Sequence, residues 1–314
     1  MTSRRARLAL LLAAVVAVAP AGCGLGAGEE GSGEVRVRVS EGFGAERVSD
    51  RSYAGARKDE TVLRLLERSN DVETRFGGGF VQAIEGRAGG REQGRRVDWF
   101  YYVNGIEAGV GAAERRLHAG DRVWWDLHDW GAAMRVPAVV GSFPEPFISG
   151  AEGKRIPVRI ECADIKGREC DEVVERLEKA GVKRTSRAIL SQFEQGEVLR
   201  VLVGRWEQLR LDPVASRIGR GPQQSGVYAR FDKSGRRLDV LDPQGRVARS
   251  LGAGAGLVAA TASSEGSPVW VVTGTDVVGL AAAAAALETS VLDGRFAVAI
   301  ENGQPIRVPD DEAP

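Results

Sequence analysis

The sequence is poor in the residues that enzymes and metal sites most often use. Its 314 residues include only two histidines and three cysteines. It contains no Gly-x-Ser-x-Gly nucleophile turn, no His-Glu-x-x-His zinc pair and no Gly-Lys-Ser/Thr phosphate loop. Each of these patterns places a nucleophile, a metal ligand or a phosphate-binding backbone at a fixed position. We therefore predict that the protein is not an enzyme, has no resident cofactor and has no metal site.

An excess of charge of one sign is also absent. The chain has 43 Lys and Arg against 43 Asp and Glu, so its formal net charge is zero. Proteins that bind nucleic acid usually carry a basic excess that neutralises phosphates, so we predict no nucleic-acid partner. The content of 43% apolar and 27% charged residues is ordinary for a globular protein. At about 150 residues per domain, the length favours two domains.

Long hydrophobic runs are missing as well, apart from a short one near the N-terminus. The apolar run at residues 8–19 follows three arginines and ends in small residues before Cys23. A membrane-spanning helix needs about 20 apolar residues, so this run is too short to cross a bilayer comfortably. A basic segment, a short apolar segment and small residues are typical of an export signal. We therefore predict a signal peptide at residues 1–22.

Cys23 extends this prediction to a lipid anchor. It directly follows Ala21 and Gly22, as the lipidated cysteine does in a bacterial lipoprotein signal. Residues 23–33 are rich in glycine and predict a flexible tether to the extracytoplasmic face of the cell membrane. Pro20 stands where Leu or Val is usual, so a cleaved signal with a chance cysteine is the alternative. The sequence leaves both Sec and twin-arginine export open.

The other two cysteines, Cys162 and Cys170, are eight residues apart. In an oxidising compartment two cysteines at this separation are expected to form a disulfide. Closing so short a loop contributes roughly 2–3 kcal/mol to stability. Metal binding is the weaker alternative, because four ligands are wanted and no histidine follows His128.

Two aromatic runs dominate the first half of the chain, at residues 99–103 and 123–128. Aromatic and β-branched residues at this density favour strands, and the side chains of a strand alternate between its two faces. The predicted core face consists of Trp99, Tyr101, Val103, Val123, Trp125 and Leu127. The opposite face consists of Phe100, Tyr102, Trp124, Asp126 and His128, and is the predicted ligand-binding surface. Its occupant is a flat ligand, another protein, or the protein's own second domain or connector.

These runs carry a resemblance to a known family. The pattern Trp99-x-Tyr101-x-Val103-Asn104-Gly105, followed by Leu117-x-x-Gly120-Asp121-x-Val123-x-Trp125, resembles the domain family DUF4430. That family is similar to the C-terminal β-domain of transcobalamin and intrinsic factor, the animal cobalamin carriers. The resemblance covers residues 34–131. It implies a β-grasp-like domain, with strands around one helix at residues 61–66, and a corrinoid as a candidate ligand.

The rest of the chain resembles no family that we recognise. Residues 132–154 form a connector rich in Pro and Gly, and its apolar residues predict that it lies against one or both domains. Residues 155–309 repeat a strand–Gly–helix pattern, which predicts a mixed α/β domain, and residues 310–314 are a tail. Asp276, before an Ala-rich helix, is a predicted helix cap. The predicted fold class is therefore α+β.

Two functions compete at this point. In the first, the protein is a membrane-anchored binding lipoprotein that captures a small molecule, such as a corrinoid, for a membrane transporter. In the second, it is a cell-envelope scaffold or adhesion module whose aromatic face binds another protein. Stabilisation of the purified protein by a corrinoid distinguishes the first from the second, because only a bound ligand shifts the unfolding equilibrium.

The lipid anchor gives a direct test. We expect the wild-type protein in the membrane fraction, with a lipid mass on Cys23, and the Cys23→Ser variant in the soluble fraction. Cell fractionation and mass spectrometry of the N-terminal peptide measure both. A wild-type protein that is already soluble and unlipidated contradicts the lipoprotein prediction.

Overall fold

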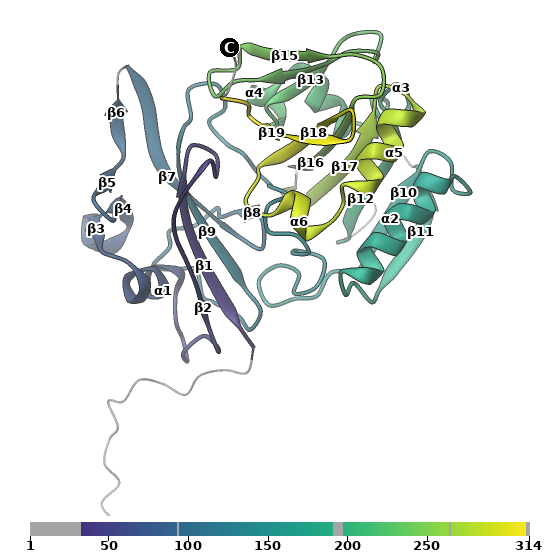
Figure 1. Ribbon diagram of the computed structural model, residues 1–314. Helices are drawn as coiled ribbons and strands as arrows, with labels where there is room; N and C mark the ends of the chain where they lie inside the picture. The colour runs from purple at the N-terminus through teal and green to yellow at the C-terminus, as the bar shows by residue number, and fades with distance from the viewer. Residues whose placement is uncertain (1–32, 93, 191–196, 264, 312–314) are drawn as a thin grey trace, which may run out of the picture.

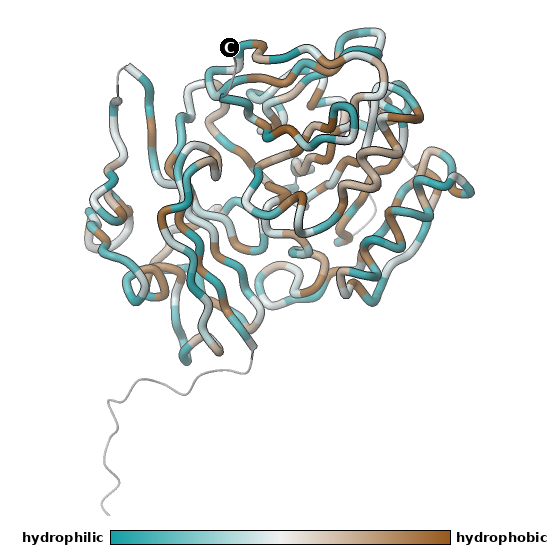
Figure 2. The backbone as a smooth tube through the Cα atoms, viewed as in Figure 1, coloured by the Kyte–Doolittle hydropathy of each residue, from teal (hydrophilic) through white to brown (hydrophobic). Residues whose placement is uncertain are grey.

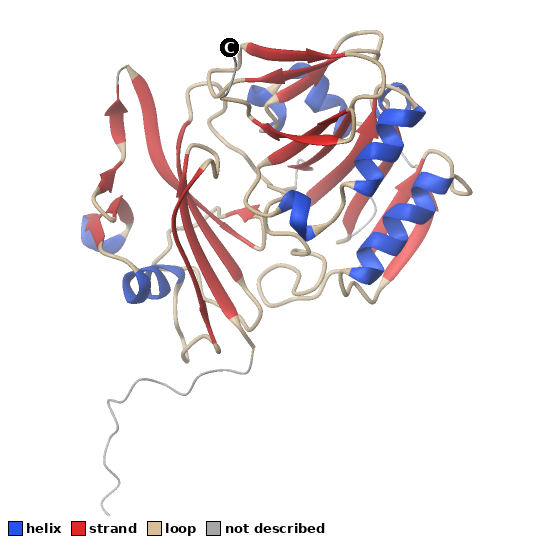
Figure 3. Ribbon diagram, in the orientation of Figure 1, coloured by secondary structure: helices blue, strands red, loops and turns tan. Residues whose placement is uncertain are grey.

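The computed structural model describes residues 33–92, 94–190, 197–263 and 265–311. The predicted signal peptide, Cys23 and most of the predicted tether lie outside these residues. Helices and strands mix in an α+β architecture that has four sheets in the described part of the chain (Figure 3). Within the same residues, no helix combines the length and apolar character needed to cross a membrane.

The N-terminal half is built on one mixed sheet. Its strands, in spatial order, are β2 (Glu46–Tyr53), β1 (Val35–Glu41), β9 (Arg122–Asp129), β7 (Arg95–Val103) and β6 (Gly90–Glu92), with β8 (Ile106–Glu107) paired to β7. β1 and β9 run parallel, whereas the other neighbours run antiparallel. On the side away from the C-terminal half lie α1 (Val62–Ser69), β3 (Val72–Arg75), η1 (Phe76–Gly78), β4 (Phe80–Ile84) and β5 (Arg87–Ala88) (Figure 1). The finer description of this half as β-grasp-like stays a prediction.

The predicted core face of the aromatic strands is confirmed. Trp99, Tyr101, Val103, Val123 and Trp125 are buried in one cluster with β1 and α1, and Leu127 packs at its edge. The Trp125 and Tyr101 rings stack with centroids 4.8 Å apart. α1 contributes Val62, Leu65 and Leu66 to the same cluster. Period-2 alternation in the strands and an amphipathic helix thus produce one core.

The C-terminal half contains a seven-stranded sheet. Its strands, in spatial order, are β11 (Thr185–Ile189), β10 (Val158–Cys162), β12 (Leu199–Arg205), β17 (Pro268–Gly274), β16 (Gly256–Ala262), β18 (Ala297–Glu301) and β19 (Gln304–Val308). The first four run parallel and the last three are added antiparallel. β12, β16 and β17 are buried on both faces, and Figure 2 shows their apolar character. Continuous apolar runs are typical of strands covered on both sides.

Two layers cover this sheet. One face packs against α2 (Arg168–Lys179), α5 (Val277–Ala285) and α6 (Thr289–Leu292). The other face packs against α3 (Trp206–Leu209), η2 (Ala215–Arg220), α4 (Pro222–Ser225) and a small sheet of β13 (Ala229–Phe231), β14 (Leu238–Leu241) and β15 (Val247–Leu251). α5 lies very close to β16, because a Cβ on Gly256 would come within 3.1 Å of the Ala283 Cβ. The Asp276 cap is confirmed, since its carboxylate accepts a hydrogen bond from the Gly279 N–H at 2.9 Å.

The predicted disulfide is present. Cys162 at the end of β10 and Cys170 in α2 are bonded, with their Cα atoms 6.0 Å apart. Both residues are buried in the cluster under α2. The bond therefore attaches the first turn of α2 to the strand that precedes it.

The connector lies against both halves, as its apolar residues predicted. Val139 belongs to the cluster that contains the aromatic residues of the N-terminal half. Val140, Phe143 and Phe147 belong to the cluster under α2 and α5. Its backbone also bonds to the C-terminal half, because the Val140 N–H donates to the Phe296 carbonyl at 3.1 Å. The connector is therefore an internal layer.

Trp125 tests the assignment of the core face. Truncating it to Ala removes a buried indole and leaves a cavity, so we expect the free energy of unfolding to fall by about 3–5 kcal/mol. Urea denaturation followed by circular dichroism measures this loss. A loss below about 1 kcal/mol means that the core does not depend on this face.

Candidate functional site

The predicted ligand face lies at the interface between the two halves of the protein (Figure 1). Four of its side chains, Tyr102, Trp124, Asp126 and His128, are buried, and Phe100 is half-buried. Phe296, immediately before β18, covers them. Its ring meets those of Tyr102, Trp124 and His128 edge-on, with centroids 5.5, 5.1 and 5.4 Å apart respectively.

The prediction of an external ligand on this face therefore needs correction. The structure brings the five predicted residues together, but the surface that covers them belongs to the protein's own C-terminal half. Apolar rings of this size gain free energy when water is removed from them, and Phe296 supplies that cover. Internal cover was one of the occupants that the sequence left open.

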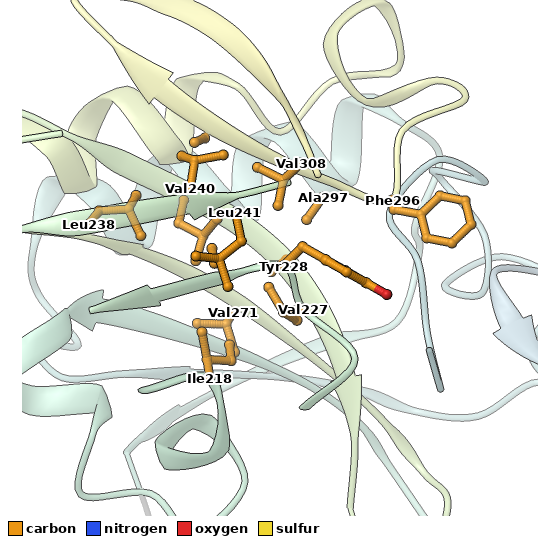
Figure 4. Packing of buried hydrophobic residues seen from close by; sticks show 14 of the residues in the cluster. Ile218, Val227, Tyr228, Leu238, Val240, Leu241, Val271, Phe296, Ala297 and Val308 are labelled. Carbon is orange, nitrogen blue, oxygen red and sulfur yellow. The ribbon is translucent and has the colours of Figure 1, made fainter. Parts of the chain in front are cut away.

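A turn between β1 and β2 adds another aromatic side chain to this interface. The Phe43 and Phe100 rings both contact the His128 ring, with centroids 4.6 and 4.5 Å from it. Phe43 also contacts Tyr228 and Phe296 of the C-terminal half. Figure 4 shows the Tyr228 side chain pointing from the C-terminal core toward the side on which Phe296 lies. We use the name aromatic interface for the cluster of rings formed by Phe43, Phe100, Tyr102, Trp124, His128, Tyr228 and Phe296.

Asp126 holds that turn in place. Its fully buried carboxylate accepts hydrogen bonds from Ser40 Oγ at 2.6 Å, Phe43 N at 2.9 Å and Gly44 N at 2.7 Å. His128 Nδ1 lies 2.9 Å from the same carboxylate. A buried carboxylate is tolerated when its oxygens are hydrogen-bonded in this way. Asp126 and His128 thus position the aromatic interface.

Two phenol groups in the aromatic interface have no hydrogen-bond partner among the described residues. They are the buried hydroxyls of Tyr102 and Tyr228. Burial raises the pKa of both phenols above the ordinary value. Both groups therefore stay protonated and uncharged at neutral pH.

An ion pair joins the two halves beside the rings. Arg38 of β1 contacts Asp50 of β2 at 2.9 Å and Asp293 of the C-terminal half at 2.7 Å. The Arg38 side chain is only 7% exposed. Removing one member would leave a buried charge without its partner, which is strongly destabilising. The ion pair therefore favours one relative position of the two halves.

A groove opens near β8, away from the ring cluster's own residues. It encloses about 830 Å³ and is lined from both halves. Its walls include Trp130, Met134 and Arg135 on one side and Arg217, Gln224 and Thr261 on the other. An adjoining pocket of about 400 Å³ shares Glu107, Gly109 and Glu152 with it.

The Trp130 ring forms a fixed wall of the groove. The Arg96 guanidinium lies over it, 4.9 Å from the ring centroid. The indole N–H donates to Asp98 at 2.8 Å. Met134, which also lines the groove, is 70% exposed. A fixed aromatic ring and a flexible thioether in one groove are suited to an apolar ligand surface.

Glu107 is a largely enclosed charged group of this groove. Its side chain is 8% exposed and accepts a hydrogen bond from Arg135 at 3.1 Å. Burial raises the pKa of the Glu107 carboxyl above its ordinary value, against the opposing effect of Arg135. The group is therefore protonated more easily than an exposed glutamate.

Residues 59–129 match a family described as "Domain of unknown function (DUF4430)". The chain contains a DUF4430 domain. The resemblance seen in the sequence is thereby confirmed for these residues. A comparison with curated proteins gives no match.

Two solved structures are similar to part of this chain. One is a proposed metal-binding protein from Ruminococcus gnavus ATCC 29149, with 17% identity over 31% of this chain and 98% of that chain, and a TM-score of 0.24. The other is haptocorrin in complex with Cbi, with 15% identity over 31% of this chain and a TM-score of 0.25. The chain spans only 26% of the length of haptocorrin.

Sequence reasoning missed the groove beside the DUF4430 domain. Trp130 lies two residues after the second aromatic run, and Met134 is an apolar residue near the start of the connector. The closeness of Trp130 and Met134 in the sequence is the feature from which this part of the groove could have been predicted. The opposite wall, with Arg217 and Thr261, comes from the other half of the chain, and no local pattern joins the two.

Metal ligation has no visible site in the described part of the chain. No group of three or more His, Cys, Asp or Glu side chains is placed there to hold an ion. The absence of a resident metal stays a prediction.

Phe296 tests whether the aromatic interface joins the two halves. Phe296→Ala should separate the unfolding of the DUF4430 domain from that of the C-terminal half, because it removes the ring that covers Tyr102 and Trp124. Phe231→Ala is the matched control, since Phe231 is equally buried at 4% exposure but stacks on Trp206 within the C-terminal half.

Both substitutions should cost about 3–5 kcal/mol. Only Phe296→Ala should increase hydrogen exchange along β7 and β9, as measured by mass spectrometry. Equal exchange in the two variants contradicts the role of Phe296 as the joining residue.

Proposed function

We propose that this is an extracytoplasmic, lipid-anchored protein that binds a small molecule in the groove between its DUF4430 domain and its C-terminal half. The groove itself is the observation that carries the proposal. Its volume of about 830 Å³ falls within the range of small-molecule sites, about 300–1,000 Å³. Such sites are often formed where two domains meet.

The chemistry of the walls suits a flat ligand with polar substituents. Trp130 offers a ring face and Met134 an adaptable apolar surface. Arg135, Arg217 and Gln224 offer hydrogen-bond donors around them. A corrinoid combines a broad ring with polar side groups, and it is the first candidate because of the sequence resemblance to the cobalamin carriers. A ligand of that size would extend from the groove into the adjoining pocket.

The anchor and the transporter complete the proposal. Lipid attached to Cys23 would keep the protein at the membrane, where it would deliver its ligand to a membrane transporter. The residues around Cys23 and the glycine-rich residues 23–33 support this part. The proposal includes no catalytic step.

The burial of the aromatic face favours ligand binding over the scaffold alternative. A scaffold or adhesion role was inferred from an aromatic surface in need of a protein partner. Phe296 and the connector occupy that surface, so its composition needs no external partner as an explanation. The groove, by contrast, has exposed apolar side chains such as Met134.

A thermal-shift screen with cobinamide and cyanocobalamin tests the ligand class. A ligand at 1,000 times its dissociation constant stabilises the folded state by about 4 kcal/mol. We expect saturable stabilisation of the soluble Cys23→Ser protein by at least one of the two compounds.

Substitutions then test the place of binding. Trp130→Ala should weaken binding about fivefold, because an aromatic contact contributes about 1 kcal/mol beyond its buried area. Met134→Glu should weaken it as well, whereas Leu211→Glu should not, since Leu211 is also exposed, at 63%, but does not line the groove. Isothermal titration calorimetry measures all three. Unchanged affinity in both groove variants places the ligand elsewhere, and no stabilisation by either compound rules out a corrinoid.

A further inference from the structure

A second cavity lies at the interface between the halves, beside the Arg38–Asp293 ion pair. It encloses about 240 Å³. Three arginines line it, Arg38 and Arg47 from the N-terminal half and Arg307 from the C-terminal half. One carboxylate lines it, that of Asp293. The charged groups of the wall are therefore mainly guanidinium groups.

The two carboxylates beside Arg38 are already engaged. Asp293 and Asp50 both accept hydrogen bonds from Arg38. Asp50 is also bonded to Arg36, which lies next to Arg38 on the same face of β1. The guanidinium groups of Arg36, Arg38 and Arg47 therefore share only two carboxylates, those of Asp50 and Asp293. These five side chains carry one net positive charge.

Arg47 is the group with donors available to a ligand. Its side chain is 60% exposed. Its guanidinium nitrogens lie 3.9 Å from Asp50 and 3.9 Å from Asp293, beyond hydrogen-bond distance. Thus Arg47 contributes charge to the cavity without using its donors on either carboxylate.

Arg307 of the C-terminal half lines the same cavity. Its Nη1 donates to the Phe43 carbonyl at 3.2 Å and to the Gly294 carbonyl at 3.0 Å. These two bonds hold the guanidinium at the edge of the aromatic interface. Trp124 forms an apolar part of the wall, and ionic attraction is stronger beside such a surface than in water.

We propose that this cavity binds a phosphate-sized oxyanion. Guanidinium groups present planar, paired donors that match the oxygens of phosphate and carboxylate groups. A bound anion would complete the hydrogen bonds of Arg47 and offset the excess positive charge. Because Arg47 and Arg307 come from different halves, the bound anion also connects the N-terminal half to the C-terminal half.

Thermal unfolding in phosphate tests the proposal on the soluble Cys23→Ser protein. Inorganic phosphate should raise the midpoint of unfolding by about 2–4 °C relative to chloride at the same ionic strength and pH. Arg47→Gln should abolish this difference. Arg51→Gln is the matched control and should retain it, because Arg51 lies on the same strand, is also exposed, and does not line the cavity.

Vesicles distinguish a free anion from a lipid headgroup. Phosphatidylglycerol vesicles present the same phosphate chemistry at a membrane surface, and phosphatidylcholine vesicles serve as their control. Phosphatidylglycerol binding that Arg47→Gln removes and Arg51→Gln retains assigns the site to a headgroup. Stabilisation by dissolved phosphate without vesicle binding assigns it to a free anion.

Two results overturn the proposal. One is the absence of both phosphate stabilisation and vesicle binding. The other is an equal loss in Arg47→Gln and Arg51→Gln, which would show that the net charge of β2 acts without a defined site. Corrinoid binding in the groove is a separate measurement, so either proposal can fail without the other.

Discussion

Contact between Phe296 and the aromatic face of β7 and β9 is the interaction on which the arrangement of this protein depends. The ring removes Tyr102 and Trp124 from water and meets both edge-on. Edge-to-face pairs of this kind add about 0.5–1.5 kcal/mol each beyond the area that they bury. Without this contact, the DUF4430 domain would expose a large apolar surface, and surfaces of that kind promote association.

The polar groups around this contact set the geometry of the two cavities. Arg38 reaches Asp293 across the interface, and Asp126 holds the turn that carries Phe43. Buried ion pairs contribute little net stability, but a mismatched position leaves their charges unpaired. The groove near Trp130 and the arginine cavity near Arg47 are separate and share no lining residue. Both have walls from the two halves, so their shapes depend on the same contact.

Local sequence patterns predicted the central elements much better than the edges. The aromatic runs at residues 99–103 and 123–128 were anticipated as strands, and they lie in the central strands β7 and β9. β2, β11, β15 and β19 were not, and each is the outermost strand of its sheet. An edge strand has fewer neighbours and more water around it, so its composition is less constrained by burial. β2, for example, reads Glu-Arg-Val-Ser-Asp-Arg-Ser-Tyr and has no fully buried residue.

The sequence by itself determined the two faces of the aromatic strands, the pairing of Cys162 with Cys170 and the cap at Asp276. Each of these follows from residues that are close together in the chain, where alternation, spacing and local hydrogen bonding decide the outcome. Only the tertiary structure decided that Phe296 covers Trp124 and that Arg47 and Arg307 line the same cavity. These partners are far apart in the sequence, and burial of apolar surface is non-directional. The residues show that such a face must be covered, whereas the folded chain determines which segment covers it.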